Sequence, residues 1–325
     1  MNSFASCFRA LCLWVTAVFV ALPGLALAQS DWPSKPITLV VPYPPGGAGD
    51  QMGRMFARHL SETVKQPVIV DNRPGAGTII GSQMVAKAKP DGYTFLLGGA
   101  SNVINHFLYS KMPYGRNDLL PVAQLINRTN FLVVNPNSKF KSLADVLAQA
   151  KAQPRSVSCA NYGLGTNGHL ACAAFAKAVG VEFVDVPYRG GMAAIQDTLA
   201  GQVDMAMVVE ALPFIQEKRL VGLAVSTAER NPYAPSIPAL SETVLGFDVT
   251  PWQGIFAPAG TPADIVDRVA ADIQKMLQGE SSKQQFKAMG VIPVLRPSQK
   301  DFAHYVDNEF VRWEKMLKPL NIRMD

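Results

Sequence analysis

The sequence lacks the patterns that mark metal centres and hydrolases. Its 325 residues include four cysteines and four histidines, and His59, His106, His169 and His304 are scattered along the chain. No pair of these residues has the spacing of a zinc site. A G-x-S-x-G nucleophile elbow and a phosphate-binding loop ending in G-K-[ST] are also absent. The sequence therefore predicts no metal, no cofactor and no catalytic triad, so we expect the protein not to be an enzyme.

Long apolar segments and basic runs are absent as well. Beyond residue 28, no stretch approaches the roughly 20 apolar residues that a membrane-spanning helix needs. The formal net charge is +5, but Lys and Arg are interspersed with Asp and Glu. This excludes the basic stripe that nucleic-acid binding requires, while a mildly basic surface suits anionic solutes.

The N-terminus has the order of a secretory signal. Arg9 precedes an apolar run over residues 10–22, and the small-residue sequence 26–28 completes an A-x-A cleavage site. The apolar run is too short to span a membrane. We expect cleavage after Ala28, which gives an exported, periplasmic chain that begins at Gln29.

Two cysteines, Cys159 and Cys172, remain after the predicted cleavage. An even number of cysteines in an oxidising compartment is consistent with a disulfide. A large core does not need such a bridge, so two small buried thiols are the favoured interpretation. The sequence leaves the disulfide open.

Short apolar strands alternate with helical patterns, which predicts an α/β fold with mostly parallel sheets. The length favours two lobes. We expect a helix from Asp50, and another after Gly77 with Ile80, Met84 and Val85 on its inner face. Strands are expected at 37–41, 68–70, 94–97, 131–134, 157–160, 181–186, 203–209, 220–225 and 254–257.

One unit recurs three times: a strand, a Gly-rich turn and the start of a helix. The turns are at 43–50, 74–77 and 165–169. A helix start offers free N–H groups and the positive end of the helix dipole, and glycine lets a ligand come close. Any one such turn is explained as a tight connection, but three in one chain indicate a cleft that binds an anion.

Two features near the third turn leave alternatives. Residues 163–168 match the dinucleotide fingerprint G-x-G-x-x-G, with Glu182 and Asp185 near the distance of a ribose-binding acid. No second nucleotide-binding half is evident, and an exported protein has no supply of NAD, so no dinucleotide site is predicted. Glu210 follows the strand at 203–209, where it either faces a ligand crevice or is a solvated acid.

Together these motifs resemble the substrate-binding component of tripartite tricarboxylate transporters, also called the Bug family. The sequence departs from that family at Thr78, where a third Gly is common, and at Ala193, where a Pro is common. Glu210 lies in a region that varies with the ligand. The matching stretches cover essentially the whole mature chain: 43–50, 71–77, 90–94, 161–170, 186–190, 201–204, 252–254 and 257–262.

The resemblance implies a two-lobed type II periplasmic binding fold, with a mostly parallel sheet flanked by helices in each lobe. Residues 29–128 and 252–325 would form the first lobe, and 129–251 the second. The lobes would close by a hinge at the crossovers near 127–131 and 247–252. The implied function is binding of a small carboxylate (a dicarboxylate, an aromatic acid or an amino acid) by a monomer that delivers it to membrane transporter subunits. A secreted α/β hydrolase and a ligand-sensing module for a membrane sensor are the alternatives.

The resemblance also implies a ligand site between the lobes. The loops 43–50 and 74–78 would hold one carboxylate, largely through backbone groups and ordered water, and 166–169 with 188–189 would close from the other side. Arg189 would add charge or steer the anion, or instead form an ion pair within its own lobe. The candidate ligand-binding residues are Tyr43, Pro44, Gly46, Gly47, Asp50, Gly75, Ala76, Gly77, Thr78, Ser101, Thr166, Asn167, Gly168, His169, Tyr188, Arg189 and Glu210.

Overall fold

The computed structural model describes residues 32–296 and 298–324. The predicted signal segment and its cleavage site lie outside the described residues. The chain forms two compact units that meet in the sequence after Ser34. The fold described below is that of the second unit. Within the described ranges, no helix has the length and apolar character needed to cross a membrane.

The first sheet has six strands in the order β11-β4-β10-β3-β1-β2. Strand β1 pairs in parallel with β2 and β3, while β10 runs antiparallel to both β3 and β4. All seven residues of β10 are buried, because helices cover both faces of this sheet. The strands are β1 (Ile37–Val41), β2 (Val68–Asn72), β3 (Thr94–Gly99), β4 (Leu119–Asn127), β10 (Trp252–Pro258) and β11 (Ile292–Pro293).

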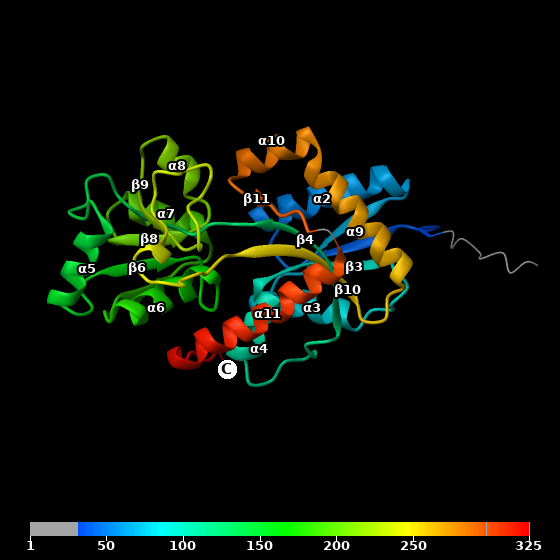
Figure 1. The fold of residues 1–325 in the computed structure, drawn as a ribbon, viewed down its shortest axis with the longest axis horizontal. Coiled ribbons are helices and arrows are strands. Elements are labelled where there is room, and N and C mark those ends of the chain that lie inside the picture. The colour runs from blue at the N-terminus through cyan, green and yellow to red at the C-terminus, as the bar shows by residue number, and fades with distance from the viewer. Residues whose placement is uncertain (1–31, 297, 325) are drawn as a thin grey trace, which may run out of the picture. The chain divides into compact units, whose positions relative to one another are not determined.

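Two groups of helices pack on the first sheet (Figure 1). On one face α2 (Ala48–Val64) contacts α9 (Ala263–Gln278), which contacts α10 (Glu280–Met289). On the other face α4 (Ala100–Leu108) contacts both α3 and α11. The remaining bounds are α3 (Ile79–Ala86), α11 (Gln299–Leu317) and the short helices η2 (Ala76–Thr78), η3 (Leu240–Glu242) and η4 (Lys318–Leu320).

The second sheet has five strands in the order β7-β6-β8-β5-β9. Successive residues of β8 face two different cores: Met205 and Met207 pack with α5 and α6, whereas Ala206 and Val208 pack with α7 and α8. This alternation is the period of two that a strand covered on both faces shows. The elements are β5 (Phe131–Val134), α5 (Leu143–Ala152), β6 (Ser158–Asn161), α6 (Asn167–Val179), β7 (Val184–Pro187), α7 (Gly191–Leu199), β8 (Met205–Val208), α8 (Leu212–Gln216) and β9 (Val221–Val225).

Both sheets are mixed, so the prediction of mostly parallel sheets was wrong in that detail. In the second sheet β6 pairs in parallel with β7 and β8, but β5 runs antiparallel to β8 and β9. The antiparallel strands β4, β10 and β5 flank the two segments that join the sheets. These segments, 128–130 and 226–251, are hydrogen-bonded to each other, since the N–H of Arg128 donates to the carbonyl of Pro251 (2.7 Å). The predicted crossover near 127–131 covers the first segment, and the one near 247–252 covers only the end of the second, while the hinge and the extent of each lobe stay predictions.

Two helices begin, and one ends, at residues whose own chemistry favours a helix terminus. Ser142 caps α5 in a capping box with Asp145, and Ser298 caps α11 with Asp301 in the same way. Helix α6 ends at Gly180, whose φ of 71° is left-handed.

The inner face of α3 was predicted correctly at Val85 and wrongly at Ile80 and Met84. Val85 is buried, but Ile80 and Met84 are 52% and 42% exposed, and Ile79, Gly81 and Ser82 are buried instead. Apolar residues lie all around this short helix, so periodicity cannot choose its face. Gly81 decides it, because a Cβ there would lie 3.0 Å from the carbonyl oxygen of Arg73.

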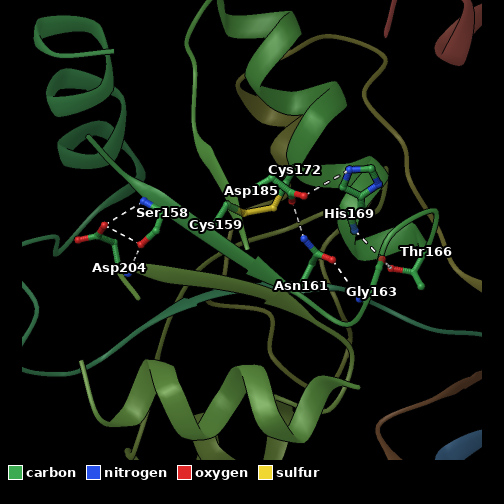
Figure 2. The surroundings of a disulfide bond; sticks show 9 residues. All are labelled: Ser158, Cys159, Asn161, Gly163, Thr166, His169, Cys172, Asp185 and Asp204. Atoms are coloured by element: carbon green, nitrogen blue, oxygen red, sulfur yellow. Dashed lines mark hydrogen bonds and ion pairs between the residues drawn. A yellow bond between two sulfur atoms is a disulfide. The ribbon is translucent and has the colours of Figure 1, made fainter. Parts of the chain in front are cut away.

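Cys159 on β6 and Cys172 on α6 form a disulfide (Figure 2), so the favoured interpretation of two free thiols was wrong. Both residues are buried in the core of the second sheet. The bridge ties the strand before the turn at 163–166 to the helix that follows it.

Replacing both cysteines, as Cys159→Ala/Cys172→Ala, should lower the free energy of unfolding. The bridged residues are 13 apart, and closing a loop of about that length restricts the unfolded chain by about 3 kcal/mol. Urea unfolding measures the difference. The wild type should lose a similar amount in a reducing agent, whereas the double variant should not respond to it; equal sensitivity of the two proteins would show that the bridge is not formed.

Candidate functional site

A cavity of about 990 Å³ lies at the loops of both sheets. Three smaller cavities in the described part of the chain measure about 290, 220 and 480 Å³. The walls of the large cavity come from the turns before α2, α3 and α6, the starts of α4 and α7, the residues after β8, and both crossovers. Segments far apart in the sequence therefore meet at one site.

Five α-helices begin at this cavity. The wall includes Gly47 before α2, Thr78 before α3, Ser101 in α4, Asn167 in α6 and Gly190 before α7. The first N–H groups of a helix have no partner within the helix, and the helix dipole places about half a positive charge there. The cavity therefore attracts an anion even before its charged side chains are considered.

Twelve of the seventeen candidate residues line the cavity. They are Tyr43, Pro44, Gly47, Gly75, Ala76, Gly77, Thr78, Ser101, Thr166, Asn167, Arg189 and Glu210. The other five are not among the residues that line the cavity: Gly46, Asp50, Gly168, His169 and Tyr188. Which of them touches a solute stays a prediction, but the position of each has a structural reason.

Asp50 shapes the turn at 43–50 from behind. Its carboxylate accepts hydrogen bonds from the Gly46 N–H (2.8 Å), Arg54 Nε (2.8 Å) and Asn72 Nδ2 (2.9 Å). Burial raises the pKa of this carboxyl, but the hydrogen bonds from Arg54, Gly46 and Asn72 outweigh it and hold the pKa below its usual value. Asp50 therefore stays charged as a support of the turn, with its oxygens already occupied.

His169, Gly168 and Tyr188 support the opposite wall. His169 Nδ1 accepts the Gly165 N–H (3.2 Å), and its Nε2 lies 3.6 Å from Asp185 (Figure 2). Gly168 lets α6 pack closely against β8, because a Cβ at residue 168 would lie 2.6 Å from the Met207 carbonyl oxygen of that strand. The Tyr188 hydroxyl donates to Asp197 (2.6 Å), so it is not directed at the cavity.

The Thr166 hydroxyl is also committed to the protein, although Thr166 lines the cavity. It donates its hydrogen to the Gly163 carbonyl (2.6 Å) and accepts from the His169 N–H (3.5 Å), which caps α6 (Figure 2). A hydroxyl has one hydrogen, so in this structure the Thr166 hydroxyl has none left to donate to a solute, and a contact of Thr166 with the solute stays a prediction.

The turn before α3 has a run of left-handed backbone. Consecutive φ values are 133° at Gly75, 45° at Ala76, 59° at Gly77 and 82° at Thr78. Glycine adopts such angles freely, but a β-branched residue there is strained. Strain of this kind collects at functional sites, where the surrounding structure fixes it.

Buried polar atoms without a partner gather at the same cavity. Six such side-chain atoms occur in the described residues, and four belong to residues that line it. The four are Thr78 Oγ1, Asn167 Nδ2, Glu210 Oε2 and Gln253 Oε1. Buried polar groups are nearly always paired in folded proteins, so this concentration indicates a site that a polar solute completes.

Arg128 is the main residue that the sequence did not reveal. It follows β4 on the first crossover, is 9% exposed, and donates from Nη2 to the Ala48 carbonyl (3.1 Å). Burial lowers the pKa of this guanidinium, and the Glu210 carboxylate opposes that change. Trp252 and Gln253 of the second crossover side also line the cavity. No local motif marks Arg128, because only the crossing of the two segments places it here, whereas Trp252 and Gln253 belong to the stretch 252–254 that resembles the family.

Glu210 lines the cavity rather than extending into solvent. Its carboxylate lies against Gly191, where a Cβ would collide with Oε2. Burial raises the pKa of Glu210, and the backbone N–H of Glu210, the charge of Arg128 and the backbone N–H of Val209 partly offset this. Arg189 is exposed at the cavity, and no described carboxylate lies within 4.0 Å of it, so the structure does not support an ion pair within its own lobe.

These groups suit an anion better than a metal ion. Residues 32–296 and 298–324 contain no cluster of three or more His, Cys, Asp or Glu side chains able to hold a metal. The cavity instead presents helix starts, a buried guanidinium and amide groups, which donate to carboxylate oxygens.

Known proteins with the same sequence pattern bind solutes. Residues 52–322 match the family model described as "Tripartite tricarboxylate transporter family receptor". A UPF0065 protein in the tcbD-tcbE intergenic region of Pseudomonas sp. (strain P51) is 38% identical, over 91% of this chain and 92% of that protein. Protein BugT of Bordetella pertussis is 33% identical, over 96% and 98%. The solved structure of R. palustris Rpa4515 with adipate is 32% identical with a TM-score of 0.81, over 90% of this chain and 99% of that chain.

We expect Thr78→Gly to raise the free energy of unfolding by about 1 kcal/mol. A left-handed backbone angle disfavours a residue with a Cβ by about that amount or more, and the greater freedom of glycine in the unfolded chain offsets part of the gain. The change also removes the unpaired Oγ1. Urea unfolding of the ligand-free proteins measures the effect, with Thr63→Gly in the exposed part of α2 as a control that should destabilise.

Acid should weaken the support that His169 gives to its turn. Burial lowers the pKa of His169, against a smaller opposing effect of Asp185. The unfolded chain then takes up this proton first as the pH falls, so the stability from the neutral ring is complete above about pH 6.5 and declines below it. The free energy of unfolding of wild type minus that of His169→Gln should shrink between pH 7.5 and 5. A difference that is constant over this range would contradict the assignment.

Proposed function

The chain belongs to the tripartite tricarboxylate transporter receptor family, and from this we propose that it is an exported receptor that binds a small carboxylate for the membrane subunits of such a transporter. The family consists of periplasmic solute-binding proteins. The receptor has no catalytic role and acts as a monomer that presents its bound solute to the transporter.

The observation that carries this proposal is the gathering of unpaired donors around one cavity. Five helix starts and the buried Arg128 guanidinium face a volume that also holds four unpaired polar atoms. Leaving such groups unpaired costs about 1–3 kcal/mol each. A carboxylate accepts hydrogen bonds from the backbone N–H groups, Asn167 Nδ2 and Thr78 Oγ1, and it neutralises the guanidinium. The other two unpaired atoms, Glu210 Oε2 and Gln253 Oε1, are acceptors and need a donor instead.

The cavity suits a solute of modest size. Its volume of about 990 Å³ is at the upper end of the usual range for small-molecule sites. Rpa4515, which has the same fold, was solved with the dicarboxylate adipate. In our proposal one carboxylate lies against the turn at 74–78 and Arg128, and Asn167 and Arg189 approach from the opposite wall.

Closure of two lobes would complete the site. Residues 29–128 and 252–325 would move as one body and 129–251 as the other, bending at the crossovers. Arg128 is itself on a crossover and bonds to the first residue of α2. A solute carboxylate held by Arg128 therefore acts directly on the segment that has to bend.

The alternatives find less support. A secreted hydrolase needs a nucleophile beside a base, and no histidine is among the described residues that line the cavity. A sensing role for a membrane sensor would use the same binding site and differs only in the partner of the closed form.

Arg128→Met should weaken binding of a carboxylate at least about tenfold, because a charge-assisted hydrogen bond in a buried site contributes about 1.5–3 kcal/mol. A thermal-shift screen of carboxylates identifies a ligand, and calorimetry measures both proteins. Arg189→Met is the matched control: at the exposed rim it should slow association and reduce its salt dependence more than it changes dissociation. Unchanged affinity in Arg128→Met would refute the placement of the carboxylate.

A further inference from the structure

Glu210 is the one carboxylate among the described residues that line the cavity. Helix starts and Arg128 explain how the site holds an anion, but an acidic side chain opposes one. Its Oε2 atom is buried and has no partner. A residue that is unfavourable both for the fold and for a simple anion needs a separate explanation.

No positive charge is in direct contact with Glu210, although the backbone N–H groups of Glu210 and Val209 act on its carboxylate and lower its pKa against the effect of burial. Arg128 interacts with it electrostatically, but the nitrogen and oxygen atoms of the pair are not within the 4.0 Å of an ion pair. Tyr43 and Tyr162 are the other titratable groups in this electrostatic cluster. Burial raises the pKa of both phenols, and hydrogen bonds with Gln253 and Gly168 respectively oppose this. Both phenols are therefore uncharged, and neither can neutralise Glu210.

The backbone fixes where this carboxylate lies. Glu210 follows β8, and its side chain occupies the space that a Cβ of residue 191 would fill at the start of α7. The positive end of that helix favours the ionised form. An ionised carboxylate only accepts hydrogen bonds, so its partner has to be a donor.

We propose that Glu210 accepts a hydrogen bond from a hydroxyl or ammonium group of the solute, so that the receptor selects carboxylates with a donor at their far end. This rests on the carboxylate-binding function proposed above. A dicarboxylate would place a second negative charge beside Glu210, and like charges in one buried site disfavour each other. A solute ending in a methyl group would leave Oε2 unpaired.

Calorimetry with linear carboxylates that differ only at the far end tests this selection. At pH 7.5, 5-aminovalerate or 5-hydroxyvalerate should bind the wild type at least about tenfold more tightly than glutarate or valerate, the ratio that one buried hydrogen bond to a charged group supports. The four-carbon and six-carbon series are measured alongside, so that solute length is not mistaken for selection. Glu210→Gln should abolish the preference and bind the dicarboxylate more tightly than the wild type does. Glu217→Gln, which changes an exposed acid just after α8, should retain the wild-type order.

Each other result contradicts the inference in a recognisable way. If glutarate binds the wild type best, and more tightly as the pH falls to 5.5, then Glu210 is a protonated donor to a second carboxylate and the inference is wrong. The same holds if Glu210→Gln keeps the wild-type order, or if none of these solutes binds while other carboxylates do. In all three cases the proposed function stands; it fails, and the inference with it, only if no carboxylate binds in the thermal-shift screen.

Discussion

Unpaired N–H groups at helix starts are the constraint on which the rest of this site depends. An α/β chain that runs from strand to turn to helix repeatedly brings helix starts to one edge of a sheet, and here five of them meet at one cavity. When the donors are backbone N–H groups, side chains near the turns serve to hold the backbone in place. This explains why the carboxylate of Asp50 and the ring of His169 bond to the backbone of their turns. Asp50 and His169 hold their turns by accepting backbone N–H groups of Gly46 and Gly165. Asp50 and His169 therefore affect solute binding only by positioning the backbone of these two turns.

The two charged groups of the cavity, Arg128 and Glu210, are buried near each other but do not form a direct ion pair. Arg128 is buried with one hydrogen bond to a carbonyl, and Glu210 is near enough to influence its pKa without touching it. A direct ion pair would use up both groups, whereas two separated charges leave each able to bind a solute. Arg128 lies on a crossover that is hydrogen-bonded to the other crossover. Binding of a solute to Arg128 would therefore act on the segments at which the two sheets would move.

The sequence predicted those features that a short stretch determines by itself, which include the Gly-rich turns and the motifs that carry the resemblance to the family. It failed at those elements whose position depends on residues distant in the sequence. Strand β4 contains Pro121 and Gln124 and does not alternate, so neither it nor Arg128 after it was recognised. The disulfide and the buried face of α3 depend on what packs opposite them. Spacing brought Asp50 and Thr166 into the candidate site, but only the structure shows that neighbouring backbone groups already occupy their oxygens.

In our proposal two side chains of the cavity bear on the identity of the solute. Thr78 has a φ of 82° and an unpaired hydroxyl, and Glu210 has an unpaired carboxylate oxygen. Each makes the ligand-free protein less stable than a simpler residue would, through backbone strain in one case and burial of charge in the other. Backbone donors at helix starts bind an anionic group and do not distinguish what the rest of the solute carries. In our proposal the helix starts therefore set the class of solute, whereas Thr78 Oγ1 and Glu210 Oε2 determine which member of that class fits.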